Sequence, residues 1–401
     1  MYTDHTLIIN ELERSIKFNN WNSILSFLPK GSYLVGGYIR DIILERVTKE
    51  VDIDIVVPFN AIEIGKKITD NIKSKFIILD KKREVVRIIL NGISIDIANQ
   101  VSSTIEGDLR ARDFSINSIA FLLDKKCLFD PINGLKDLEL ALLRTHSEIN
   151  LLNDPLRILR CFRFVSELNF KVDLKLITFI KKNKRKLYFV AKERINYEIQ
   201  KIVHGANALD AVLLIKTLNI FGSENLYKDS FFLDLKKINY AELNQNEKEE
   251  FLPFFFITQI LDVVSLEEFN FSKNEIAKTN LLRKWHFFLK NKNIAQLNEL
   301  DRFKLHQELE IFLPSFIFYL PQNLRLNWLN RWRDKEDKLF HPSNLLNGDV
   351  IKKNLKIEDG PILGELLQYL SKELAYKRLN NFDEAIYKAK QWIEQNAPKC
   401  D

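Results

Sequence analysis

Two neighbouring stretches of the sequence decide the fold: residues 32–41 read SYLVGGYIRD, and residues 51–57 read VDIDIVV. The first passes from aromatic and aliphatic residues through Gly36-Gly37 into a helix-forming segment, a pattern typical of a strand, a tight turn and a helix. The second alternates acidic and aliphatic residues, a pattern typical of a strand with one polar and one buried face. We therefore expect a sheet that carries two aspartates near a glycine turn.

Asp52 and Asp54 lie two residues apart on the second stretch, so their side chains point to the same face, roughly 6–7 Å apart along the backbone. Residues 92–98 read GISIDIA and alternate in the same way, which puts Asp96 on a polar face as well. Paired carboxylates can hold divalent ions, and a third one from a neighbouring strand would complete an oxygen-rich Mg²⁺ site. For the first pair alone, two aspartates on a solvent-facing edge strand are the alternative interpretation.

The glycine pair suggests a place where a phosphate group can approach the backbone. Glycine has no side chain to block such an approach, and a helix N-terminus offers free N–H groups. Arg40 lies one turn into the expected helix and can add a charge-assisted contact. The stretch lacks the Gly-Lys-Ser/Thr of a P-loop, so a plain tight turn is the alternative.

Outward from these stretches, further short strands are predicted at residues 76–79, 85–90 and 119–123, and helices near 38–46 and 61–72. After residue 150 strand signals nearly vanish, and 151–169 and 194–204 are predicted as helices. We expect an α+β fold, in which a small head with one mixed sheet is followed by an elongated, all-helical neck, body and tail. The expected divisions are an N-terminal helical segment 1–28, the head 29–147, the neck 148–205, the body 206–340 and the tail 341–401.

Composition fits a mostly helical chain, because only 12 of 401 residues are glycine and 10 are proline. Lys and Arg exceed Asp and Glu by 60 to 54, a mild excess that permits a polyanionic partner without requiring one. The three cysteines form no disulfide framework, so we expect a reducing, cytoplasmic location. The apolar stretches 251–264 and 311–320 are too short to cross a bilayer, so no membrane association is expected.

Three later motifs join the glycine turn and the aspartate pair. Residues 108–117 read DLRARDFSIN, residues 154–164 read DPLRILRCFRF, and residues 193–198 read ERINYE. They look like the RRDFTxN, EDxxRxxRxxRF and ER motifs of one family, in that family's order. On these motifs, from about residue 33 to 205, the chain resembles the class II (bacterial-type) tRNA nucleotidyltransferase and poly(A) polymerase family of the polymerase β superfamily.

The resemblance implies roles for individual residues. Asp52 and Asp54 would bind two Mg²⁺ ions and be catalytic together with Asp96. Residues implied in nucleotide binding are Gly36, Gly37, Arg40, Arg112, Asp113, Asn117, Asp154, Arg157, Arg160 and Arg163. Supporting roles are implied for Asp41, Glu193 and Arg194. Internal hydrogen bonding at the start of a helix is the alternative for Asp113 and Asn117.

The implied activity is template-independent addition of C and/or A, from CTP and ATP, to the 3′ end of tRNA, with release of pyrophosphate. The tail is the implied tRNA contact. A poly(A) polymerase acting on other RNA 3′ ends is an alternative of the same class. A non-catalytic RNA-binding relative is a second alternative, which the retained aspartates disfavour.

Base choice has a chemical basis in Asp154 and Arg157, three residues apart on a predicted helix. A carboxylate only accepts hydrogen bonds and a guanidinium only donates them, so one such pair can satisfy the amine and ring nitrogen of either cytosine or adenine. Uracil and guanine present the opposite order and would leave groups unpaired, at a cost of about 1–3 kcal/mol each. A helix cap at Asp154-Pro155, with surface arginines behind it, is the alternative.

The sequence departs from the family pattern in three places. Ala111 replaces the first arginine of the doublet, and Asn153 replaces the acidic residue before Asp154. The interval between Asp96 and Asp108 is short compared with full CCA-adding relatives, which favours an enzyme that adds only CC. The cluster of lysines and arginine at residues 181–186 is interpreted as a solvated face or as an RNA phosphate contact.

Overall fold

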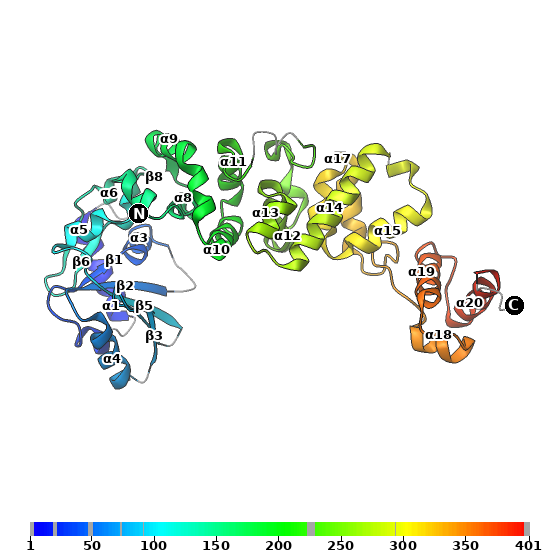
Figure 1. Cartoon of the computed structure of the whole chain (residues 1–401), viewed down its shortest axis with the longest axis horizontal. Helices are drawn as coiled ribbons and strands as arrows, with labels where there is room; N and C mark the ends of the chain where they lie inside the picture. The colour runs from blue at the N-terminus through cyan, green and yellow to red at the C-terminus, as the bar shows by residue number, and fades with distance from the viewer. Residues whose placement is uncertain are drawn as a thin grey trace. The chain divides into compact units, whose positions relative to one another are not determined.

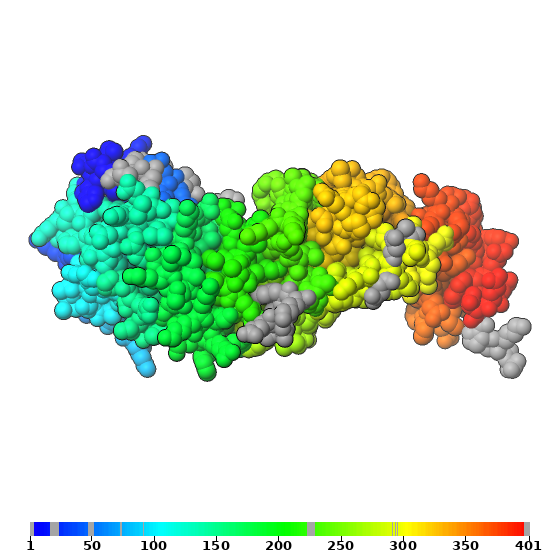
Figure 2. Space-filling view, turned by 90° about the horizontal axis from the view of Figure 1, so that it is seen from above, coloured from blue at the N-terminus to red at the C-terminus, as the bar shows by residue number. Residues whose placement is uncertain are grey.

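The chain forms two compact units, Met1–Leu214 and Ile215–Asp401, and the boundary falls inside helix α11 (Ala208–Leu218). The computed structural model describes residues 4–18, 22–46, 51–72, 74–90, 92–222, 229–292 and 294–396. These residues are coloured in Figure 1 and Figure 2, and the others are grey. The ends of the predicted segments 1–28 and 341–401 therefore lie partly outside the described residues.

A mixed seven-stranded sheet organises the first unit (Figure 1). Its order is β3-β4-β5-β2-β1-β6-β7; β2 and β5 are parallel, and the other neighbours are antiparallel. The strands are β1 (Tyr33–Val35), β2 (Val51–Val57), β3 (Lys75–Asp80), β4 (Val85–Leu90), β5 (Ile93–Asn99), β6 (Ala120–Leu122) and β7 (Cys127–Phe129). The predicted α+β organisation, with a mixed sheet first and helices after it, is confirmed.

The alternation of polar and aliphatic residues sets the two faces of this sheet. Ile53, Ile55, Ile95 and Ile97 are at most 2% exposed, so they form the buried face of β2 and β5. Helix α4 (Ala61–Ile72) packs against β3, β4 and β5. The other short elements of the head are α1 (His5–Phe18), α2 (Asn22–Leu25), α3 (Gly37–Ile43), α5 (Ile105–Arg110), η1 (Ser115–Asn117) and α6 (Gly134–Glu139).

The helix predicted over residues 151–169 is wrong as a single element. It is divided into α7 (Glu148–Asn153) and α8 (Arg157–Leu168), and Asp154 between them has extended backbone angles. Pro155 explains the break, because proline disfavours a helical conformation in the residue before it and has no N–H to donate. The helix at 194–204 is present as α10 (Lys192–Val203), and it packs against α8.

The remaining elements of the neck region are short. They are β8 (Leu142–Leu143), which pairs in parallel with β9 (Lys171–Val172), then α9 (Leu174–Asn183) and the 3-10 helix η2 (Lys184–Phe189). The cations at 181–186 sit at the end of α9 and in η2, and Lys181, Lys182, Arg185 and Lys186 are exposed. Both interpretations of this cluster, a solvated face and an RNA phosphate contact, require such exposure.

The second unit has only helices among its described residues. They are η4 (Leu235–Lys237), η5 (Tyr240–Glu242), α12 (Gln245–Ile260), α13 (Val263–Glu268), α14 (Lys273–Asn291), η6 (Ile294–Gln296), α15 (Glu299–Leu309), η7 (Glu310–Phe312), α16 (Leu313–Phe316), η8 (Ile317–Tyr319), α17 (Gln322–Arg333), α18 (Gly348–Leu355), α19 (Pro361–Ala375) and α20 (Phe382–Asn396). One core gathers around Phe303, Phe316 and Phe340, and another around Ile351 and Leu366. None of the described helices is long and apolar enough to cross a membrane.

Candidate active site

A row of charged side chains crosses three neighbouring strands of the sheet. Asp54 on β2 is paired with Asp96 on β5, and Asp96 is paired with Arg87 on β4. Directly paired residues of neighbouring strands point to the same face of a sheet. Asp52 lies two residues before Asp54, so it joins this face and is exposed there. The structure thus brings the three predicted carboxylates to one face, opposite the buried isoleucines.

The glycine turn lies directly against this row. Gly36 has a left-handed φ of 79°, and a β-carbon on it would lie 2.7 Å from Oδ2 of Asp54 and 3.1 Å from Nη1 of Arg112. A side chain at this position would therefore be both strained and in contact with the carboxylate. Gly37 begins α3, and a β-carbon there would meet the Arg40 guanidinium at 3.5 Å. The turn leaves an open approach to Asp54 that only glycine at 36 permits.

Electrostatics around Asp54 favour a positive partner. Burial raises the pKa of Asp54 above its ordinary value; Asp96 and Asp52 raise the pKa further, and Arg112 and Arg160 oppose the rise. A carboxylate in this setting is more easily kept charged when a cation binds beside it. Arg112 is a predicted phosphate ligand on this side of the glycine turn. Its buried Nε atom lies 3.5 Å from Oδ2 of Asp108 and has no hydrogen-bond partner among the described residues.

Asp96 is already occupied by a protein partner. Arg87 donates from Nε to Oδ1 of Asp96 at 2.7 Å and from Nη2 to Oδ2 at 2.8 Å, so both carboxylate oxygens accept a bond. Within the part of the chain that the structure describes, no group of three or more His, Cys, Asp or Glu side chains is arranged to hold a metal ion. The oxygen donors of Asp52 and Asp54 suit Mg²⁺ in kind. The residues therefore fit a divalent ion at these two aspartates, while Asp96 has another partner.

Four residues of the predicted nucleotide-binding set form one internal network. Arg40 donates to Asn117 at 2.8 Å, Asn117 donates to Asp113 at 3.2 Å, and Arg160 donates to Asp113 at 2.6 Å. Burial alone would raise the pKa of Asp113, but Arg160 and Asn117 lower it to about 2. Arg40 also pairs with Asp41 at 3.0 Å. This network joins α3 and the segment before β6 to helix α8 of the neck.

The aromatic ring of Phe164 lies within the same network. The guanidinium carbons of Arg40, Arg160 and Arg163 are 5.2, 5.6 and 4.9 Å from its centroid. Phe164 also meets Phe114 edge to face at 5.6 Å. Such cation–π contacts stabilise arginines that are close together and partly removed from water.

The predicted base-reading pair is not joined directly. Arg194 on α10 donates to Oδ2 of Asp154 at 3.0 Å, whereas Arg157 donates to the carbonyl of Ala111 at 2.9 Å and that of Asn150 at 3.3 Å. Asp154 also accepts a backbone bond from Leu156 at 3.3 Å, as the cap alternative proposed. Arg163 is buried and pairs with Glu198 at 3.1 Å, and Glu193 is an exposed neighbour of Arg194 in the first turn of α10.

Sequence reasoning missed Arg87 and Glu198, which pair with predicted site residues. The signal for Arg87 was present, because it stands between Val86 and Ile88, which are both fully buried. The same alternation that placed Asp96 places Arg87 on the polar face. Glu198 ends the motif at residues 193–198, but its pairing with Arg163, 35 residues away on another helix, has no signal in the spacing.

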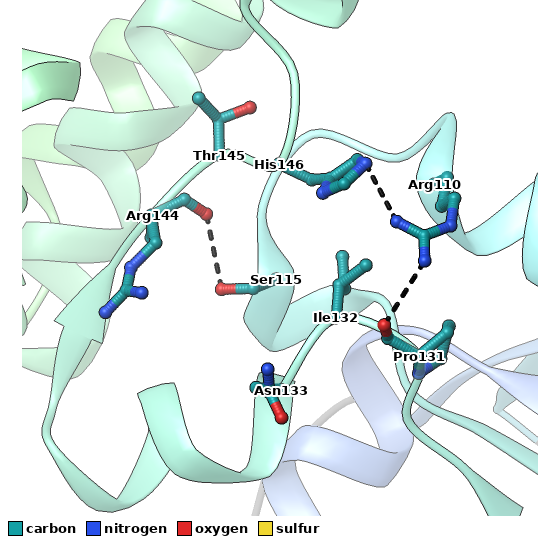
Figure 3. A pocket seen from close by; sticks show the side chains of 8 residues that line it. All are labelled: Arg110, Ser115, Pro131, Ile132, Asn133, Arg144, Thr145 and His146. Carbon is teal, nitrogen blue, oxygen red and sulfur yellow. Dashed lines mark hydrogen bonds between the residues drawn. The ribbon is translucent and has the colours of Figure 1, made fainter.

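A separate pocket of about 350 Å³ opens elsewhere in the first unit (Figure 3). It is lined by Arg110, Ser115, Pro131, Ile132, Asn133, Arg144, Thr145 and His146, none of which belongs to the predicted site. Its two arginines have acidic partners, since Arg110 pairs with Glu106 at 2.8 Å and Arg144 with Asp137 at 3.0 Å. None of the three aspartates of the carboxylate row lines this pocket.

Comparison with known proteins gives consistent matches. A family model described as the Poly A polymerase head domain matches residues 32–101 and 96–144. A CC-adding tRNA nucleotidyltransferase of Synechocystis sp. is 27% identical over 396 residues, covering 92% of this chain and 95% of the relative. A CCA-adding enzyme of Ligilactobacillus salivarius is 27% identical over 398 residues, covering 91% and 93%.

The fold comparison agrees with these matches. A Thermotoga maritima CCA-adding enzyme complexed with tRNA superposes with a TM-score of 0.73 at 22% identity, covering 97% of this chain and 98% of that one. The head of this chain therefore matches the Poly A polymerase head domain family, and nearly the whole chain is similar to tRNA nucleotidyltransferases.

Proposed function

We propose that this chain is a template-independent RNA nucleotidyltransferase that adds C and/or A, from CTP and ATP, to the 3′ end of tRNA and releases pyrophosphate. The observation that carries the proposal is the set of Asp52 and Asp54 on one sheet face, against the turn at Gly36 and the side chain of Arg112. Relatives named as CC-adding and CCA-adding enzymes along almost the whole chain support the same reaction. A cytoplasmic location, where tRNA is processed, belongs to this proposal.

In the proposed reaction Asp52 and Asp54 would hold two Mg²⁺ ions. When bound, these ions would activate the RNA 3′-hydroxyl and stabilise the negative charge on the departing pyrophosphate. Gly36 leaves room for the triphosphate beside Asp54, and Arg112 donates hydrogen bonds to it. Gly37 contributes backbone at the start of α3.

The internal network has a positioning role in this proposal. Arg40, Asp113, Asn117 and Arg160 are committed to one another, so they fix the head against helix α8 at the place where a nucleotide would enter. Asp113 and Asn117 would then face the ribose from a fixed frame. Holding reacting groups within such a frame accounts for a large share of catalysis in reactions that involve little protein chemistry.

For base choice, we propose that Asp154 accepts a hydrogen bond from the exocyclic amine of C or A and that Arg157 donates to the ring nitrogen. Asp154 is about one third exposed and is oriented by Arg194. The bonds from Arg157 to two backbone carbonyls hold its guanidinium close to Ala111.

For the product, we propose addition of CC without the final A. The connection between β5, which ends at Asn99, and α5, which begins at Ile105, is five residues long. A short connection here, together with the CC-adding relative from Synechocystis, supports partial addition, although the L. salivarius relative is named CCA-adding at the same identity. A poly(A) polymerase would instead extend RNA with many A residues.

One assay separates these products. The purified chain is incubated with tRNA that lacks its terminus, or that ends in C or CC, and with CTP and ATP separately and together. CC addition predicts two C residues from CTP and no A on any primer, while CCA addition predicts a final A on the CC primer. Asp52→Asn should reduce incorporation at least about a thousandfold with tRNA binding retained. Unchanged incorporation in that variant would refute the catalytic assignment.

A further inference from the structure

The third carboxylate of the row already has a protein cation. Arg87 and Asp96 stand directly opposite each other on β4 and β5, and their side chains form a bidentate pair at 2.7 and 2.8 Å. Bidentate guanidinium–carboxylate pairs are among the strongest side-chain hydrogen bonds, and this one uses both oxygens of Asp96. The exposed fractions of the two side chains are 37% and 21%, so the pair is partly shielded from water.

The pairing changes the charge balance of the site. Three carboxylates on one face carry three negative charges, but Arg87 neutralises one of them and leaves two on Asp52 and Asp54. The pKa of Arg87 is raised mainly by its hydrogen bond to Asp96, and the charges of Asp96, Asp52 and Asp54 raise it further. Arg87 therefore interacts with Asp52 and Asp54 as well, at longer range. A guanidinium two strands away from Asp54 on the same face, which interacts with the charges of Asp52 and Asp54, would repel a divalent ion bound there.

We propose that Arg87 is the permanent counter-ion of Asp96, so that the divalent-ion site consists of Asp52 and Asp54 without Asp96. This inference rests on the proposed function, because it assumes that these two aspartates bind the ion. Asp96 is then a positioning residue, and its partner Arg87 sets the affinity of the neighbouring site through its charge. The family resemblance implied a catalytic role for Asp96 beside the two metal ligands, and the inference limits that role to positioning.

The double variant Arg87→Gln/Asp96→Asn gives the sharpest test. It removes one positive and one negative charge, so the net charge of the site is unchanged, and glutamine and asparagine can still hydrogen-bond to each other. Mn²⁺ binding is measured on the full chain, without RNA or nucleotide, by the loss of the free-ion electron paramagnetic resonance signal. The inference predicts an affinity within about twofold of the unmodified protein. A loss of tenfold or more in a folded double variant would show that Asp96 is a ligand and overturn it.

The single variants give a second, independent measurement if the double variant does not fold. Arg87→Gln should bind Mn²⁺ about three- to tenfold more tightly, because a nearby positive charge is gone. Asp96→Asn should weaken binding by only about two- to fivefold, since it removes charge and not a ligand. A weakening beyond tenfold in Asp96→Asn would overturn the inference, as would unchanged affinity in Arg87→Gln.

Two control variants distinguish a failure of this inference from a failure of the proposed function. Arg83→Gln removes an arginine that pairs with Asp80 at 3.8 Å and is 81% exposed, so it should leave Mn²⁺ affinity unchanged. Asp52→Asn should abolish tight Mn²⁺ binding. If Asp52→Asn binds Mn²⁺ like the unmodified protein, the metal assignment of the proposed function fails. If only Asp96→Asn or the double variant loses binding, the proposed function stands and the inference about Arg87 fails.

Discussion

Buried Asp113 and half-buried Arg160 form an ion pair, with 2.6 Å between Oδ2 of Asp113 and Nε of Arg160, although they are 47 residues apart in the chain. Asp113 comes from the segment that follows α5, and Arg160 comes from helix α8. The pair therefore fixes the neck to the head at the predicted nucleotide site. The contribution of this ion pair to the free energy of unfolding can be measured at several pH values.

Asp113→Asn should lower the free energy of unfolding of the first unit by about 3 kcal/mol at pH 7, because it leaves Arg160 without its buried partner. The folded pKa of Asp113 is about 2 and lies below the ordinary value. The charged carboxylate thus stabilises the fold above about pH 4, and this contribution disappears as the pH falls toward 2.

Urea unfolding at several pH values checks this prediction. The difference between the unmodified protein and Asp113→Asn should shrink by about 2 kcal/mol between pH 4 and pH 2. Glu63→Gln serves as a control, because Glu63 pairs with Lys67 on an exposed helix face and its loss should have no measurable effect. A difference that stays constant across this pH range would contradict the assigned ion pair.

Gly36→Ala should remove activity because a β-carbon would lie 2.7 Å from the Asp54 carboxylate. Gly92 is a matched control: its φ of 82° is nearly the same, but a β-carbon there would meet no described residue beyond its chain neighbours within 4 Å. Both substitutions should cost about 1–2 kcal/mol in stability through backbone strain. Only Gly36→Ala should also lose CTP incorporation and Mn²⁺ binding. Equal loss of activity in both variants would show that backbone strain alone is responsible.

Asp154→Ala should relax base choice. Its carboxylate is the proposed acceptor for the amine of cytosine or adenine, and discrimination between CTP and UTP should fall roughly 5- to 150-fold, equivalent to about 1–3 kcal/mol. Competition between labelled CTP and UTP in single-nucleotide addition measures this ratio. Asp173→Ala, which removes the cap of α9, is the control and should keep the ratio. Preserved discrimination in Asp154→Ala would exclude it as the base reader.

The sheet and the shared face of its aspartates were predictable because alternation along a strand is a local signal. The runs at 33–35, 51–57 and 85–90 are strands, and the buried isoleucines stand where the pattern placed them. The partners of the charged side chains were not predictable in the same way. Arg194 meets Asp154 across 40 residues, and this pairing follows from how α8 and α10 pack, which no spacing along the chain encodes.

At the break at Asp154-Pro155, the two local signals in the sequence disagree. The apolar periodicity across 151–169 suggested one continuous helix, and only the alternative of a helix cap at Asp154-Pro155 placed a helix start there. Proline at this position prevents the helical geometry in the preceding residue, and the structure gives Asp154 φ −137° and ψ 91°. The local backbone rule therefore outweighs the periodic pattern, and it exposes the Asp154 carboxylate at the end of α7.

His306 should make the second unit sensitive to mild acid. It is 2% exposed and lies between Trp328 and Phe340 at ring distances of 4.7 and 3.9 Å. Among the residues that the structure describes, its Nδ1 atom has no hydrogen-bond partner. Burial, together with the charge of Arg331, lowers its pKa to about 3. Because the imidazole of His306 takes up a proton near pH 6.5 in the unfolded chain, the free energy of unfolding should fall by about 1.4 kcal/mol per pH unit below that value, until the folded state titrates as well.

His306→Gln should remove this pH dependence of the free energy of unfolding between pH 6 and pH 4, as measured by urea unfolding. His204→Gln, at an exposed position, should retain it. An unchanged slope in His306→Gln would mean that other groups set the acid sensitivity.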